Sequence, residues 1–192
     1  MHIEILVEEL SMAEALEILV PQIVPGHTFG VHPYQGKTDL LGKLNERLRS
    51  YAGMRSSWSE LRVVLVVDRD NEDCHDLKQK LLNACSAAKC DALCRIAIEE
   101  LEAWFFGDVD ALRAAYPSVP ASLASKARYR DPDAIAGGTW EALERVLQRA
   151  GHYANGIPKV EVARKVAEHM RPDANRSRSF QVFRDGLRQI VA

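Results

Sequence analysis

The sequence predicts an α/β fold in which a mostly parallel sheet is flanked by helices and followed by a helical extension. The aliphatic run from Val63 to Val67 has no helical period, which is typical of a strand buried on both faces. Before Gly107, strand-like and helix-like segments alternate, as they do in parallel α/β sheets. After Gly107, only helical patterns follow. We therefore expect an α/β core over residues 1–107 and a helical extension packed on it over residues 108–192.

The core divides into eight expected elements. In chain order they are a strand at His2–Val7, a helix from Ser11, an extended piece at Thr28–His32, a helix from Thr38 to about Tyr51, the strand at Val63–Val67, a helix from Asp73 to about Ala88, a strand at Ala92–Ala97 and a helix at Ile98–Phe106. Ser11 and Glu14 have the spacing of a capping box, and Thr38 and Asp73 are suitable helix caps. Pro21 and Pro25 predict a loop before the second strand.

Four helices are expected in the extension, at Val109–Tyr116, Thr139–Ala150, Val160–His169 and Ser179–Val191. The last has a clear apolar stripe that includes Phe180, Phe183 and Leu187.

The composition is that of an ordinary globular protein, with 47% hydrophobic and 27% charged residues among 192. No apolar run approaches the roughly 20 residues of a membrane span, and the first residues lack the basic start of a signal peptide. We therefore expect a cytoplasmic protein without membrane contact. The four cysteines form no CxxC pair and are expected to be reduced thiols.

The net charge of −2 conceals an asymmetry along the chain. Residues 1–110 contain 11 basic and 19 acidic residues, whereas residues 111–192 contain 14 basic and 8 acidic residues. An acidic half suits metal coordination, and a basic half suits a phosphate-bearing partner. Alternatively, the two halves simply attract each other.

Two aspartates, Asp68 and Asp70, follow the valine-rich strand, and Glu8 or Glu9 follows the first strand. The carboxyl ends of neighbouring parallel strands share one sheet edge, where ligands bind. Carboxylates two apart on extended backbone point the same way. Together these groups would form a hard-oxygen site for Mg²⁺ or Mn²⁺, with Glu8 the better choice of the two glutamates. The alternative is an Asp-rich turn beside a solvated strand end.

Glu99 and Glu102 lie three apart on the helix expected at Ile98–Phe106, so they would share a helix face near the same sheet edge. Either could be a further metal ligand or an acid/base group, or part of a solvated helix face.

Four basic residues are candidates for phosphate or nucleic-acid contacts. Lys37 stands at an expected helix start, although Gly36-Lys37-Thr38 lacks the earlier glycine of a P-loop. Arg176 and Arg178 precede the last helix among hydroxyl residues, and Lys159 lies in the basic half. The alternative is a set of scattered surface cations.

Ile5-Leu6-Val7-Glu8-Glu9 together with Val66-Val67-Asp68-Arg69-Asp70 resembles the Toprim fold of topoisomerases, primases and OLD nucleases. The chain is more closely similar to the bacterial Toprim-like family called domain of unknown function 4276. That similarity extends over nearly the whole chain and includes the segments Gln35–Leu41, Asp68–Cys74, Ile98–Trp104 and Asn175–Phe180.

The resemblance implies a Toprim-like, Rossmann-like core in which Glu8, Asp68 and Asp70 bind Mg²⁺ for phosphoryl transfer. It also implies an ATPase partner of the kind found in phage defence. One departure is Glu9, which stands where Toprim proteins usually have glycine.

Three functions are consistent with these patterns. The first is a metal-dependent phosphoryl-transfer enzyme, such as a nuclease acting on DNA or RNA, with Glu8, Asp68 and Asp70 as catalytic residues. The second is a non-catalytic or conditionally active subunit of an ATPase, with the acidic cluster as a regulatory metal site. The third is a protein that binds a small nucleotide without nucleic acid. The patterns leave the oligomeric state open.

Overall fold

A computed structural model describes residues 1–192 and contains one sheet of four parallel strands in the order β2-β1-β3-β4. The strands are β1 (His2–Val7), β2 (Thr28–Pro33), β3 (Leu61–Asp68) and β4 (Ala92–Ala97). This confirms the predicted α/β class, a parallel sheet flanked by helices as in Rossmann-like folds.

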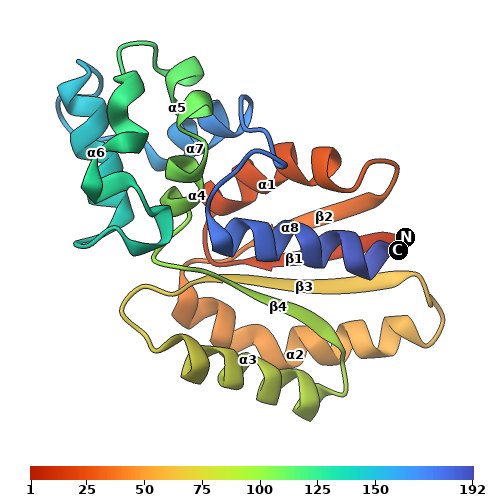
Figure 1. Ribbon diagram of the computed structural model, residues 1–192. Helices are drawn as coiled ribbons and strands as arrows, with labels where there is room; N and C mark the ends of the chain where they lie inside the picture. The colour runs from red at the N-terminus through yellow and green to blue at the C-terminus, as the bar shows by residue number, and fades with distance from the viewer.

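The helices are α1 (Leu10–Ile23), α2 (Lys37–Arg55), α3 (Cys74–Ala88), α4 (Glu102–Gly107), α5 (Val109–Ala115), α6 (Thr139–Arg149), α7 (Lys159–Ala167) and α8 (Arg178–Val191). Three short 3-10 turns lie at Ala121–Ser125, Ala127–Tyr129 and Pro132–Ala134. Helices α1 and α8 cover one face of the sheet, and α2 and α3 cover the other (Figure 1). Helices α4 to α7 gather beyond the carboxyl ends of the strands. None of the helices has the length and hydropathy that crossing a membrane requires.

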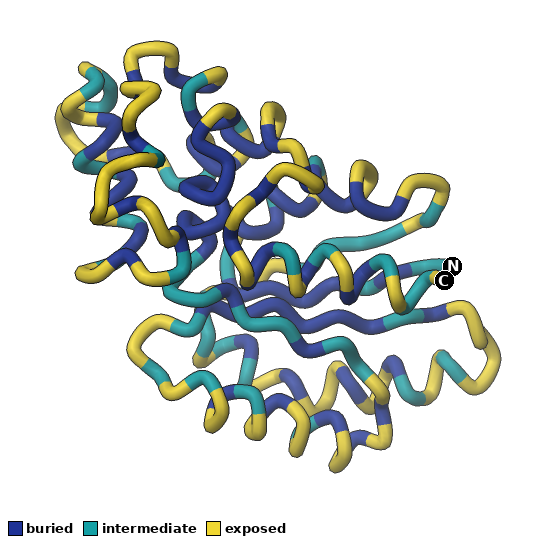
Figure 2. The backbone as a smooth tube through the Cα atoms, viewed as in Figure 1, coloured by how far each residue is buried: buried dark blue, intermediate teal, exposed yellow.

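The sheet is buried on both sides, as Figure 2 shows for the central strands. In β3, Val64 and Val66 belong to the hydrophobic cluster on the α1 and α8 side, whereas Val63, Leu65 and Val67 belong to the cluster beneath α2 and α3. This alternation confirms the doubly buried strand predicted from the valine run. The larger cluster continues into the helices after residue 107, and the division of the chain into two units there stays a prediction.

The predicted capping box at Ser11 is wrong. Helix α1 begins at Leu10 with Glu9 as its N-cap residue, and the Ser11 hydroxyl donates to the Glu9 carboxylate. Glu14 instead forms an ion pair with Arg164 of α7, a tertiary partner that local spacing does not reveal. The helix also continues through Pro21, because a proline in the last turn removes only one backbone N–H donor.

Of the two other predicted caps, one is confirmed and one is wrong. The Asp73 carboxylate accepts the backbone N–H groups of His75 and Asp76 at the start of α3. Helix α2 begins one residue before Thr38, at Lys37, after Gly36 with φ 91°. Glycine reaches this left-handed conformation without steric cost, so the chain turns into α2 with no side-chain cap.

The helix predicted at Ile98–Phe106 is wrong in its first half, since α4 begins only at Glu102. The Asp70 backbone N–H donates to the Glu99 carbonyl at 3.0 Å, which continues strand-like pairing past the ends of β3 and β4. Glu99 has φ 65° and Asp70 has φ 50°. Glu99 and Glu102 therefore share no helix face, and Asp70 does not continue the extended backbone of β3, which ends at Asp68.

Candidate acidic site at the sheet edge

The site lies between the carboxyl ends of β1 and β3. After β1 the chain forms β2 on one side of β1, and it then forms β3 on the other side. The central strands β1 and β3 therefore flank the topological switch point. Ligands of open α/β sheets bind in the crevice at such a point. Glu8 follows β1 directly and Asp68 ends β3. The Asp68 backbone N–H donates to Glu8 Oε1 at 2.8 Å, which ties the two strand ends together.

Three carboxylates of this region are almost fully buried. Glu8 is 8% exposed, Asp68 7% and Glu102 only 3%. Asp68 Oδ1 is buried with no hydrogen-bond partner. An unpaired buried carboxylate oxygen is costly in a folded protein and is typical of a position that a ligand or an ion completes.

Burial and mutual repulsion raise the pKa values of all three carboxyl groups. Desolvation raises the pKa of Glu8 from 4.5 to about 7, although the charge of Lys37 acts in the opposite direction. Desolvation, followed by the charges of Glu102 and Glu8, raises the pKa of Asp68 well above its ordinary value. Desolvation and the charge of Glu100 raise the pKa of Glu102 to about 8. Positive charge added at this place would favour their ionised forms.

Lys37 supplies one such positive charge from the first residue of α2. Its Nζ atom lies 2.8 Å from Asp70 Oδ2, 3.1 Å from Glu72 Oε1 and 3.9 Å from Glu8 Oε1. The Gly36 backbone N–H donates to the Glu8 carbonyl at 2.8 Å, which fixes the start of α2 beside the strand end. Burial opposes the charged form of Lys37, but the bond to Asp70 and the charge of Glu8 outweigh it and raise its pKa.

Asp70 and Glu99 reach the site but face cations of the chain. Asp70 binds Lys37, and Glu99 forms an ion pair with Arg69. A cavity of about 530 Å³ with no apolar lining residue lies beside them. Its four carboxylates belong to Asp70, Glu99, Glu100 and Glu141.

Lys159 closes the site from the helical extension. Its Nζ atom lies 3.8 Å from Glu9 Oε2 and 4.7 Å from the centre of the Trp140 ring. The charges of Glu9 and Glu102 raise its pKa against the effect of burial. Glu100 Oε2 accepts the Thr139 hydroxyl at 2.9 Å and the Trp140 backbone N–H at 2.8 Å, which holds the start of α6 here.

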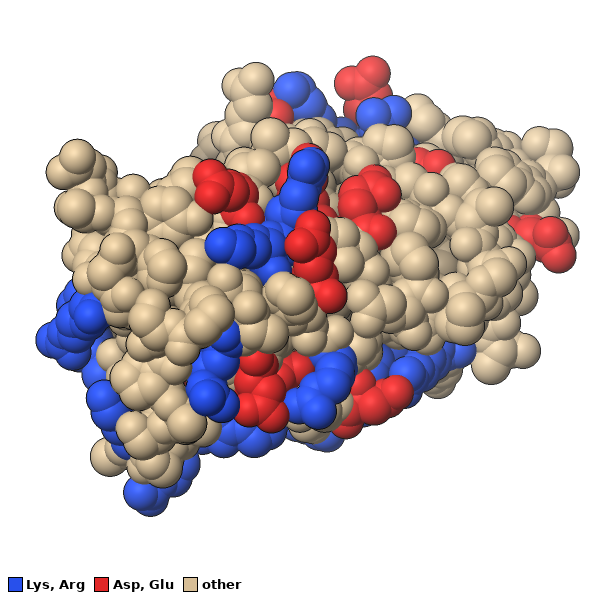
Figure 3. Space-filling view, turned by 90° about the horizontal axis from the view of Figure 1, so that it is seen from above, with Lys and Arg blue, Asp and Glu red and all other residues tan.

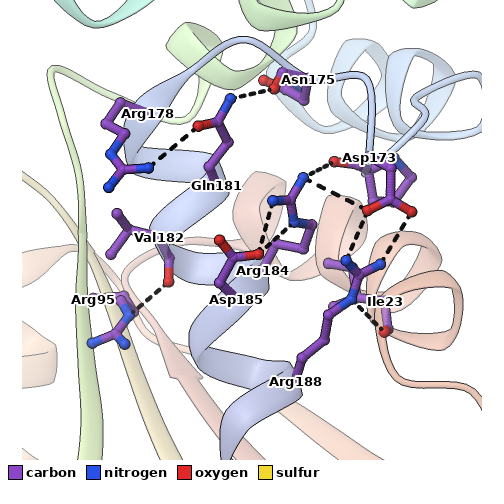
Figure 4. Close-up of polar contacts among 11 residues, drawn as sticks. Ile23, Arg95, Asp173, Asn175, Arg178, Gln181, Val182, Arg184, Asp185 and Arg188 are labelled. Atoms are coloured by element: carbon purple, nitrogen blue, oxygen red, sulfur yellow. Dashed lines mark hydrogen bonds and ion pairs between the residues drawn. The ribbon is translucent and has the colours of Figure 1, made fainter.

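Arg176 and Arg178, the other two predicted phosphate contacts, lie away from the carboxylates. Both are exposed. Arg176 donates to the carbonyls of Arg130 and Phe106. Arg178 points along α8 toward Gln181 and forms no ion pair (Figure 4).

The structure thus brings three buried carboxylates together, those of Glu8, Asp68 and Glu102. Around them lie four residues that form ion pairs: Asp70, Glu99, Lys37 and Lys159.

Sequence reasoning missed four residues of the site: Glu72, Glu100, Arg69 and Trp140. The position of Glu72 two residues after Asp70 was a usable signal. Glu100 and Trp140 meet only through long-range packing, which no local pattern encodes.

No group of three or more His, Cys, Asp or Glu side chains lies in an arrangement that would hold a metal ion. In chemical terms the residues do fit Mg²⁺ or Mn²⁺, because the donors are carboxylate oxygens and one of them, Asp68 Oδ1, has no partner. Glu8, Asp68 and Asp70 would hold the ion once Asp70 turns from Lys37.

The fold and the site place the chain in a structural class: it is a Rossmann-like α/β protein with buried carboxylates at the topological switch point. A family model described as "Domain of unknown function (DUF4276)" matches residues 7–188, and the chain belongs to this family. A search of curated proteins and a search of solved structures found no match.

Proposed function

We propose that this protein is a divalent-metal-dependent phosphoryl-transfer enzyme, a nuclease that cleaves DNA or RNA in phage defence. The observation that carries the proposal is the buried, unpaired Asp68 carboxylate joined to Glu8 at the switch point. The resemblance of the two strand ends to Toprim domains, including those of OLD nucleases, supports it.

In this proposal Glu8, Asp68 and Asp70 hold Mg²⁺ or Mn²⁺, which would offset the negative charge that develops on the phosphoryl oxygens. Glu8 Oε1 accepts the Asp68 N–H, so Oε2 is the atom that either binds the ion or, where Asp68 and Asp70 alone hold it, takes a proton from the attacking water. Burial raises the pKa of Glu8 to about 7 before a metal binds, and the charge of a bound ion would lower it, so Glu8 would be ionised and able to accept a proton at neutral pH. Lys37, released from Asp70, donates to the substrate phosphate.

The extension and the start of α4 each have a role in the proposal. Lys159, Arg176 and Arg178 contact the nucleic-acid backbone, and Glu102 supports a second ion. Glu99 can become a further ligand of this second ion only after its ion pair with Arg69 breaks.

The test is incubation of the purified protein with plasmid, single-stranded DNA and RNA in the presence of Mg²⁺ or Mn²⁺. We expect cleavage that falls at least about a hundredfold in Asp68→Asn. Asp76→Asn, an exposed aspartate of α3, is the matched control and keeps full activity. No cleavage of any substrate, or equal cleavage by Asp68→Asn, overturns the proposal.

One observation favours a second function, a conditionally active subunit of an ATPase. Lys37 and Lys159 already pair with carboxylates at the site, so the carboxylates have internal counter-charges before any metal binds. A partner that displaces these lysines would open the site. Cleavage seen only after co-expression with an ATPase supports this function, and full activity of the isolated chain excludes it.

A further inference from the structure

Two buried cysteines lie in contact on the side of the sheet covered by α2 and α3. Cys85 Sγ in α3 is 3.8 Å from Cys94 Sγ in the edge strand β4. All four cysteines of the chain are free thiols. The proposed phosphoryl transfer makes no use of this pair.

Each of the two cysteines lines a cavity. Cys94 lines one of about 490 Å³ between α3, β4 and α8, together with Cys74. Cys85 lines another of about 540 Å³ at the end of α3, together with Cys90. Open space large enough for a small oxidant therefore lies beside each residue of the pair, although the cysteines themselves are buried.

The two thiols differ in their surroundings. Lys78 Nζ and Arg95 Nη1 both donate to the Cys94 carbonyl, and neither cation forms an ion pair with a carboxylate. The hydrogen bond from Cys85, followed by the charges of Lys78 and Arg95, lowers the pKa of the Cys94 thiol against the effect of burial. The same hydrogen bond, together with burial, raises the pKa of Cys85. When one of the two thiols ionises, the negative charge is therefore on Cys94, and Cys85 keeps its proton.

We propose that Cys85 and Cys94 form an oxidative modification site that a hydroperoxide converts to an intrachain disulfide between α3 and β4. The Cys94 thiolate attacks the peroxide, breaks its O–O bond and becomes a sulfenic acid, while hydroxide (or alkoxide) leaves and takes up a proton. The Cys85 thiol then attacks the sulfenic sulfur, forms the S–S bond and releases water. The two thiols are oxidised and the peroxide is reduced.

The movement required is small. A disulfide bond is about 2.05 Å long, so each sulfur has to move by about 0.9 Å from the present 3.8 Å separation. The disulfide would join two elements that carry the acidic site, because α3 follows the Asp68–Asp73 segment and β4 leads to Glu99.

The test uses the full chain under native conditions. The folded protein is treated with hydrogen peroxide, the oxidant is removed and the protein is denatured. The remaining thiols are then alkylated, and the digested peptides are mapped by mass spectrometry. We expect a linked pair of peptides containing Cys85 and Cys94, lighter by two hydrogen atoms than the reduced pair, with Cys74 and Cys90 still alkylated. Dithiothreitol restores four alkylated cysteines.

Two matched controls are Cys74→Ser and Cys90→Ser, which alter the other thiol of each cavity and keep the link. In Cys85→Ala, dimedone traps a sulfenic acid at Cys94, whereas Cys94→Ala yields none at Cys85. Four alkylated cysteines after oxidation, or a link through Cys74 or Cys90, overturns the proposal. Wild-type mapping decides even if a variant fails to fold, and none of these readouts depends on nuclease activity.

Discussion

At the scale of single residues, Lys37 has two roles. It neutralises the acidic site, and it is also the expected phosphate contact. Its Nζ atom contacts Asp70 and Glu72 and lies near Glu8. A divalent ion at the same carboxylates has to displace this ammonium group, since two cations held by one set of oxygens repel each other. Lys37 and a metal ion would therefore compete for these carboxylates.

We expect Lys37→Met to bind Mn²⁺ about tenfold more tightly than the wild type, equivalent to about 1.4 kcal/mol. Isothermal titration with Mn²⁺ measures the difference. The control is Lys80→Met, because Lys80 pairs with Glu72 on the outside and contacts neither Asp70 nor Glu8. Unchanged or weaker Mn²⁺ binding by Lys37→Met contradicts the competition.

Glu4, in the middle of β1, shows a different kind of carboxylate environment. It hydrogen-bonds to His2 Nε2 at 2.7 Å, to the Tyr51 hydroxyl at 2.8 Å and to His32 Nε2. Burial acts to raise the pKa of Glu4, but these three hydrogen bonds outweigh it and lower the pKa below 4.5.

A lowered pKa means that Glu4 stabilises the fold in its ionised form. This contribution is complete above the unfolded pKa and is lost as the pH falls through the lower folded value. We expect Glu4→Gln to be less stable than the wild type by about 1–2 kcal/mol at neutral pH. Urea unfolding from neutral pH down to about pH 3 should show this gap closing in acid. A gap that stays constant, or one that Glu60→Gln reproduces, contradicts the assignment.

At the scale of elements, α4 and α8 meet at a close backbone contact. Gly107 ends α4, and a Cβ atom there would lie 2.9 Å from the Ser177 backbone nitrogen and in collision with the Asn175 carboxamide. Asn175 is buried and donates to the Trp104 carbonyl at 2.8 Å, so it has little freedom to move. The start of α8 therefore depends on a glycine in another helix.

Two glycine substitutions with opposite signs test this contact. We expect Gly107→Ala to lower the free energy of unfolding by about 1–3 kcal/mol through overpacking. Gly42→Ala, inside α2 with open space around its Cβ position, should raise it by about 0.5–1 kcal/mol through helix propensity. Chemical denaturation measures both, and equal effects of the two changes would exclude the packing argument.

At the scale of the whole molecule, the two halves of opposite charge attract each other at specific points. Arg164 pairs with Glu14 and Lys159 with Glu9, each joining the extension to the core. On the face in Figure 3, basic side chains in the centre and along the lower edge lie next to acidic ones. On α8, Arg184 and Arg188 both contact Asp173 (Figure 4). Part of the basic excess is therefore neutralised within the molecule.

The proposed nucleic-acid contacts have a matching salt dependence. If Lys37, Lys159, Arg176 and Arg178 all contact phosphates, the logarithm of the binding constant for duplex DNA should fall with the logarithm of salt at a slope of roughly −3.6. We expect Arg178→Gln to reduce the magnitude of this slope by about 1 for every DNA sequence. Fluorescence anisotropy at several salt concentrations measures it. A slope near zero for the wild type contradicts backbone binding by these residues.

Local sequence determined a large part of this structure. The valine run and the alternation of segments were sufficient for the parallel sheet, because strands buried on both faces must be apolar throughout. They also placed Glu8 and Asp68 at one sheet edge, since parallel strands bring their carboxyl ends together. The cap at Asp73 was predictable because its hydrogen bonds are to residues two and three positions away.

Only the tertiary structure decided which carboxylates of the site are paired with cations and which are buried. The directions of Asp70 and Glu99 depend on left-handed backbone and on cations from distant parts of the chain, Lys37 and Arg69. The contact between Cys85 and Cys94 likewise requires α3 to pack against β4. Sequence patterns report local periodicity, whereas charge pairing and burial arise between segments that meet only after folding.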